Sequence, residues 1–128
     1  MTRVWLQAVR AGDLDSLAHL AAEGLDVNAR DEYGQTALML AARAGHGEVV
    51  RWLVARGADL DHTAKFGLSA LMLAALGGHA VVARVLVDAG ADPTLRGTGA
   101  PGFAGKTAFD LAPDDETRRV LRTSDVRL

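Results

Sequence analysis

The sequence predicts an all-α solenoid of stacked helix-turn-helix units joined by β-turn loops. Two segments, 31–63 and 64–96, are identical at 16 of 33 aligned positions, which indicates an internal repeat. Each copy contains two apolar runs at helical spacing, and each run ends at a glycine. Helices of about nine residues are marginal alone in water, so we expect them to be stabilised by stacking on their neighbours.

The period of 33 residues also reaches toward both ends of the chain. Gly12 and Gly24 lie one period before Gly45 and Gly57. Toward the C-terminus the register returns late, because five extra residues sit within "LRGTGAPGFAGKT". We therefore predict one domain over 1–122, whose outer units are atypical caps, and a tail that frays. The four units are about 1–30, 31–63, 64–96 and 97–122, and the tail is 123–128.

The first helix of each central unit is expected to begin after a hydroxyl side chain. Thr36 and Ser69 precede "ALMLAARAG" and "ALMLAALGG", and a hydroxyl at this place accepts a free backbone N–H. Gly45 and Gly78 end these runs, since glycine tolerates the left-handed conformation that follows a helix. The second helices are predicted in "GEVVRWLVAR" and "AVVARVLVDA", which end at glycines as well.

The pattern D-x-x-G-x-T-A-L-x-x-A-A-x-x-G-H-x-x-V-V-x-x-L-V-x-x-G-A-D resembles the ankyrin repeat. It is matched from Asp31 to Asp59 and again from Gly67 to Asp92, and the resemblance covers about residues 3–122. The usual T-P-L-H reads "TALM" and "SALM", and the leading Asp of the third unit is replaced by Ala64. The resemblance therefore implies that the turn network lacks the hydrogen bond of the missing His.

The segment "APGFAGKT", Ala100–Thr107, loosely fits a phosphate-binding loop. Such a loop requires a buried strand before it, and the preceding "ADPTLRGTG" cannot form one. In the repeat register, Gly105-Lys106-Thr107 takes the place of Gly34-Gln35-Thr36, so Gly forms the turn and Thr caps a helix. A nucleotide-binding protein or enzyme that uses this loop is the alternative function.

Composition favours a soluble cytoplasmic protein without a cofactor or metal. The 14 Lys and Arg are outnumbered by 16 Asp and Glu, which argues against nucleic acid as a partner. There is no cysteine, no His pair at metal-ligand spacing and no apolar run long enough for a membrane span. The abundance of Ala, Arg, Gly and Val suggests a bacterial source.

Other conspicuous residues have structural interpretations. His46 and His79 share one repeat position, which is structural in ankyrin-like chains. Trp5 aligns with Leu38 and Leu71 and is expected in the core, whereas Trp52 is expected to pack between second helices. The acidic "PDDET" is expected in the first turn of the last helix, where the macrodipole favours negative charge.

The resemblance implies a non-enzymatic module that binds a partner protein through turn tips and the exposed side of the first helices. We expect this module to be a monomer, with self-association through apolar side chains of the caps as an alternative. The resemblance places three groups of residues there: the tips Glu32, Tyr33, Gln35, Lys65, Phe66 and Leu68; the helix row Arg10, Arg43 and Leu76; and Phe103 and Lys106 of the last unit.

Tyr33, Phe66 and Phe103 suggest an aromatic ridge along this face. Exposed aromatic side chains beside Arg10 and Arg43 are typical of interface hot spots and would suit an acidic or mixed protein surface. The alternative is that Tyr33 and Phe66 fold back and pack between adjacent turns. Our functional hypothesis is that the module inhibits or shields one enzyme or toxin.

Overall fold

The computed structural model describes residues 2–125, with side chains as far as Arg122. The described part contains eight α-helices and no β-strand, only two isolated bridges, which confirms the expected all-α solenoid. The first helices of the four units are α1 (Arg3–Ala11), α3 (Ala37–Ala44), α5 (Ala70–Leu76) and α7 (Ala108–Leu111). The second helices are α2 (Leu14–Ala22), α4 (Gly47–Ala55), α6 (Ala80–Asp88) and α8 (Asp115–Asp125).

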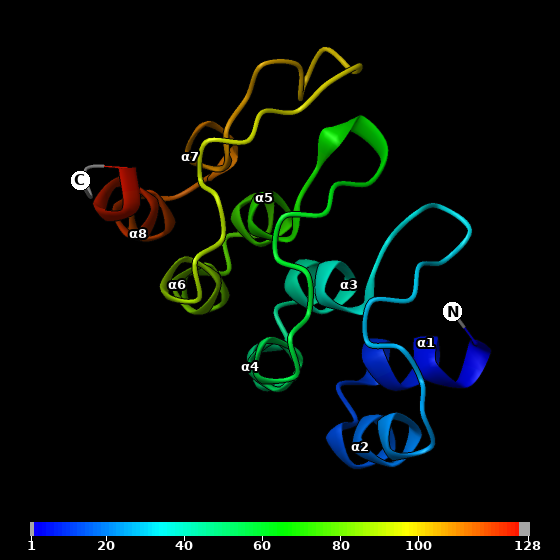
Figure 1. Cartoon of the computed structure of the whole chain (residues 1–128). Coiled ribbons are helices and arrows are strands. Elements are labelled where there is room, and N and C mark those ends of the chain that lie inside the picture. Colours follow the sequence, from blue (N-terminus) through cyan, green and yellow to red (C-terminus); the bar gives the residue numbers. More distant parts are fainter. Residues whose placement is uncertain (1, 126–128) are drawn as a thin grey trace.

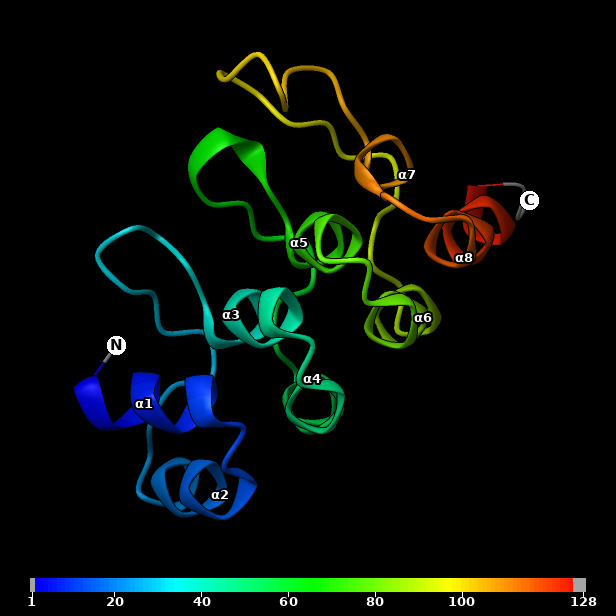
Figure 2. The ribbon, with the colours of Figure 1, turned by 180° about the vertical axis from the view of Figure 1, so that it is seen from behind.

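The helices form two rows (Figure 1), with α1, α3, α5 and α7 in one and α2, α4, α6 and α8 in the other. The long loops that join the units project away from the rows on one side, as the reverse view also shows (Figure 2). No helix within residues 2–125 is long and apolar enough to cross a membrane. Of the expected tail, residues 126–128 lie outside the described part of the chain.

Hydroxyl caps begin the first helices, as predicted. Thr36 Oγ1 accepts the Met39 N–H at 3.3 Å, and Ser69 Oγ accepts the Met72 N–H at 3.3 Å. The Thr36 N–H in turn donates to Met39 Sδ at 3.4 Å, so a weak sulfur acceptor partly replaces the bond expected to be missing from this turn. Because the same geometry recurs one period apart, α3 and α5 start in register.

His46 and His79 tie each unit to the one before it. His46 Nε2 lies 3.0 Å from the carbonyl oxygen of Arg10, and His79 Nε2 lies 3.1 Å from that of Arg43. Gly45 has φ of 77°, and a Cβ there would lie 2.7 Å from the His79 ring. The structural role predicted for both histidines is therefore confirmed, and it fixes the ends of α1 and α3.

The core lies between the two rows and is richest around α3 and α5. Nearly every residue of α5 is buried, and small alanines on both helices allow them to pack closely. Trp5 is 1% exposed, as expected for a core residue. Trp52 is packed as well, but against Trp5 of the first unit, with ring centroids 6.3 Å apart.

Candidate functional site

The turn tip of the second unit is stabilised by its own aspartate. Asp31 Oδ1 accepts the backbone N–H of Tyr33 at 2.9 Å and that of Gln35 at 2.8 Å. This Asx-type turn satisfies two backbone N–H groups of the tip, and His62 Nε2 lies 2.9 Å from the Gly34 carbonyl oxygen. Tyr33 is therefore left on the surface, where 66% of it is exposed.

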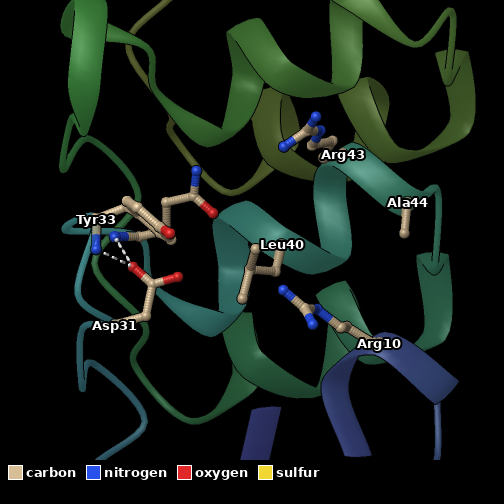
Figure 3. A pocket seen from close by; sticks show the side chains of 7 residues that line it. Arg10, Asp31, Tyr33, Leu40, Arg43 and Ala44 are labelled. Atoms are coloured by element: carbon tan, nitrogen blue, oxygen red, sulfur yellow. Dashed lines mark hydrogen bonds between the residues drawn. The ribbon is translucent and has the colours of Figure 1, made fainter. Parts of the chain in front are cut away.

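A pocket of about 440 Å³ lies beside this tip, at the junction of the first and second units. Figure 3 shows Leu40 between Arg10, which comes from α1, and Arg43, which comes from α3. Leu40 is half-buried, and both arginines are exposed. We call this the polar pocket; its lining residues are Arg10, Asp31, Tyr33, Gln35, Leu40, Arg43 and Ala44.

The polar pocket carries a net positive charge, because two arginines and one aspartate line it. Among the side chains that the structure describes, no carboxylate forms an ion pair with the Arg10 or Arg43 guanidinium. The one acidic residue in the lining, Asp31, directs Oδ1 at two backbone N–H groups. Two exposed guanidinium groups beside an apolar side chain can therefore receive a carboxylate from outside.

The third turn tip is built differently, because Ala64 offers no side-chain acceptor and only its carbonyl accepts, from the Gly67 N–H. The chain forms a short 3₁₀ turn, η1 (Lys65–Gly67), in which Phe66 has φ of 66° and ψ of 18°. The Phe66 carbonyl accepts the Thr98 N–H at 2.7 Å. The Phe66 ring lies 5.5 Å from that of Phe103. The inserted segment of the last unit thus supports the third tip.

A second pocket, of about 270 Å³, lies between the second and third units. We call it the apolar pocket; it is lined by Phe66, Leu68, Leu73, Leu76 and Phe103, with Gln35, Arg43 and Lys65 around them. Lys65 Nζ lies 5.0 Å from the centre of the Phe66 ring. Because Gln35 and Arg43 line both pockets, the two pockets are adjacent.

Most of the residues predicted for the site lie around these two pockets. Arg10, Tyr33, Gln35 and Arg43 line the polar one; Lys65, Phe66, Leu68, Leu76 and Phe103 line the apolar one. Glu32 and Lys106 are exposed and are not among the lining residues of either pocket. Nine of the residues expected from the repeat register thus gather around two adjacent pockets.

Two expectations need correction. Tyr33, Phe66 and Phe103 do not form one ridge, because among the described side chains the ring contact joins only Phe66 and Phe103. Leu68 is only 8% exposed and is not a free tip residue. It stands just before the Ser69 cap, and Leu73 is at the fourth helical position, so the two occupy the places of a hydrophobic staple and point inward.

Leu40 and Leu73 line the two pockets, and the sequence analysis did not single them out. They lie 33 residues apart, and each stands three positions before a predicted site residue, Arg43 and Leu76. Residues three apart share a helix face. The signal was present in the repeat, but apolar residues in an alanine- and leucine-rich run are ordinarily assigned to the core.

The loop that resembles a phosphate site has its amide groups occupied. The backbone N–H groups of residues 103–107 donate within the protein. Their acceptors are the carbonyls of Gly97, Ala100 and Phe103 and the carboxylate of Asp110. A phosphate would have to displace these bonds and approach the Asp110 carboxylate, so the geometry supports a repeat turn with a Thr107 cap.

Comparison with known proteins agrees with this architecture. A family model described as ankyrin repeats, in three copies, matches residues 5–97. No curated protein matches the sequence. Ankyrin repeats are generally protein–protein interaction modules and typically act as scaffolds without enzymatic activity. The matched residues make up well over half of the 128-residue sequence, so the chain belongs to the ankyrin-repeat family.

Proposed function

We propose that this chain binds a partner protein through the polar pocket, the apolar pocket and the exposed tips beside them, which together we call the binding face. The proposal depends chiefly on Arg10 and Arg43, which are exposed and have no ion-pair partner among the described side chains. Exposed Tyr33 stands next to them. Arginine and tyrosine are enriched in the residues that contribute most to binding energy.

The contacts around Arg10 and Arg43 favour binding of a partner to these side chains. His46 and His79 hold the backbone carbonyls of Arg10 and Arg43, so both arginines start from a fixed backbone position. Less conformational entropy is then lost when a partner binds. Leu40 and Leu76 add apolar surface that a partner would remove from water.

We further propose that binding inhibits or shields the partner, which we place in the bacterial cytoplasm. A specific interface of ordinary size covers about 800 Å² on each protein. A stacked array that covers such an area with little rearrangement would block an enzyme's substrate entry or a toxin's target surface. Inhibition of the captured partner by the purified chain would test this consequence directly.

The experiment is affinity purification from the native cell extract with three forms of the chain. The test variant carries Arg43→Ala and Leu76→Ala on the binding face. The control carries Arg51→Ala and Val81→Ala, because these residues are exposed on α4 and α6. Thermal unfolding of all three forms checks that the substitutions leave the fold intact.

We expect one protein to be captured by the wild type and the control, and its recovery to fall at least about ten-fold with the test variant. Hot-spot losses of this size are usual when a central arginine and its apolar neighbour are truncated together. Equal capture by the test variant and the control would refute the proposed binding face.

A further inference from the structure

We infer that the partner presents an extended segment with an acidic side chain and, three positions along, a bulky apolar side chain. The acidic group would sit between Arg10 and Arg43, and the apolar group would enter the apolar pocket. This inference rests on the proposed function and specifies the chemistry of the partner. It is based on the change from charged to apolar side chains along the binding face and on the spacing of the units.

The helix row changes from charged to apolar along the solenoid. Arg10, Arg43 and Leu76 occupy one repeat position, each 33 residues from the next. Since α1 packs against α3 and α3 against α5, these side chains belong to neighbouring helices in one row. A segment that lies along the row therefore meets two cations first and an apolar surface next.

The polar pocket fits a carboxylate on an aliphatic stem. Two guanidinium groups can each donate a pair of hydrogen bonds to carboxylate oxygens. Leu40 between them offers apolar contact for the methylene groups of Glu or Asp. Charge complementarity is the argument for this occupant, because the two cations have no partner carboxylate among the described side chains.

The apolar pocket fits a side chain such as Phe, Leu or Met. Phe66, Leu76 and Phe103 supply its walls, and no acidic residue is among those that line it. The Thr98 N–H bond to the Phe66 carbonyl and the contact between the two phenylalanine rings hold the wall in place without a ligand. The pocket is therefore preformed, which favours binding of a rigid apolar group.

The spacing of the units selects the conformation of the segment. The axes of packed helices lie about 8–10 Å apart, and adjacent pockets are separated by one such step. In a polyproline II segment, residues i and i+3 share a face and lie about 9 Å apart. In a β-strand, residues i and i+2 share a face at about 6.6 Å and i and i+4 at about 13 Å, so neither matches.

The inference is tested with synthetic peptides of one Glu and one Phe in an Ala/Pro background, with the Phe placed one to seven positions after the Glu. Binding to the isotope-labelled full chain is followed by NMR titration. Arg43→Gln and Leu76→Ala are the test variants. Arg51→Gln and Val81→Ala are their matched controls, because both residues are exposed on second helices.

We expect the peptide with Phe three positions after Glu to bind about five-fold more tightly than the others. Replacing its Glu by Gln should weaken binding to the wild type and to Arg51→Gln about three- to five-fold, the upper part of the range of exposed ion pairs. The same replacement should weaken binding to Arg43→Gln by a smaller factor, because only Arg10 still faces the carboxylate. Replacing its Phe by Ala should likewise weaken binding to the wild type and Val81→Ala, and should weaken binding to Leu76→Ala by a smaller factor, because Phe66 and Phe103 still line the pocket.

Equal affinity at all spacings, an optimum at any spacing other than three, equal binding of Glu and Gln peptides to the wild type, or no shift at millimolar peptide would each overturn the inference. None of these results bears on whether Arg43 and Leu76 are needed to capture the native partner. Affinity purification answers that question, so failure of the peptide chemistry and failure of the proposed function are distinguishable.

Discussion

The second and third turn tips have the same place in the repeat but are held by different side chains. In the second tip the Asp31 carboxylate accepts the N–H groups of Tyr33 and Gln35, and His62 Nε2 lies 2.9 Å from the Gly34 carbonyl oxygen. The third tip has Ala64 at the equivalent position. It keeps the equivalent backbone bonds, from Ala64 N–H to Leu68 and from Gly67 N–H to Ala64, and the inserted segment adds the Thr98 N–H and the Phe103 ring. Where the side-chain acceptor of Asp31 is missing, the inserted segment thus supplies additional contacts.

The difference explains why one pocket of the binding face is charged and the other is apolar. The tip held by Asp31 and His62 leaves Tyr33 exposed beside Arg10 and Arg43, and the pocket there is lined by charged side chains. The tip supported by the inserted segment brings Phe103 onto Phe66, and the result is an apolar pocket. The inserted segment therefore supplies Phe103 to the wall of the apolar pocket.

Among substitutions at the two tips, Phe103→Ala is expected to have the largest effect on stability. This substitution removes the aromatic support of the third tip and should lower the free energy of unfolding by about 2 kcal/mol, less than for a fully buried phenylalanine. Denaturant unfolding measures the loss. Tyr33→Ala is the matched change at the second tip, and it should stay within about 0.5 kcal/mol because Tyr33 is mostly exposed. Equal losses at both positions would contradict the distinction.

Asp31→Ala should have the next largest effect. It removes the acceptor of two backbone N–H groups and should cost about 1 kcal/mol of stability, as the loss of a helix cap does. The exposed Glu32→Ala is its control. The reciprocal Ala64→Asp should raise the free energy of unfolding by less than Asp31→Ala lowers it. The reason is that the inserted segment already supports the third tip. A larger gain at position 64 would show that this support is weak.

Replacing Phe66 by Gly and by Ala tests the left-handed backbone of the third tip. Both variants lose the aromatic contact, so their difference reports the backbone alone. Because φ is positive, the Gly variant should be the more stable by about 1 kcal/mol. Tyr33 is not among the residues with positive φ, so Tyr33→Gly should not exceed Tyr33→Ala. Chemical denaturation of the four proteins decides the outcome.

The smallest expected effect is a loss of stability in acid. Hydrogen bonds from Ser16 lower the pKa of Asp13, and hydrogen bonds from Thr94 lower that of Asp92. A carboxyl group whose pKa is lower in the folded than in the unfolded chain stabilises the fold when the pH is above its unfolded-state pKa. This contribution is lost as the pH falls through the folded-state pKa. Thermal unfolding should therefore shift downward below about pH 4. Asp13→Asn and Asp92→Asn together should reduce that shift, and an unchanged shift would contradict the assignment.

The repeat, the caps and the two helix rows could be predicted because their signals are local. Thr36, Ser69 and the glycines after the helices act within a few residues, and the period of 33 then fixes the stacking. The roles of His46 and His79 followed from the same register. Such features depend little on how distant segments meet.

The shape of the binding face could not be predicted in the same way. The position of Phe103 depends on the direction in which the inserted segment folds. The residue types of one sequence do not determine that direction. The burial of Leu68 depends on its staple-like position beside Leu73, which becomes visible only when the Ser69 cap is in place. The sequence therefore identified most of the residues around the pockets but not their grouping.

The central claim is that the tips and first helices, and not the second helices, contact the partner. Hydrogen exchange of the backbone amides, measured for the free chain and for its complex with the captured partner, tests this most directly. The account predicts slower exchange on binding at 31–35, 64–68 and the N-terminal turns of α3 and α5, with α4 and α6 unchanged. Protection confined to α4 and α6 would contradict it and would place the interface on the opposite row.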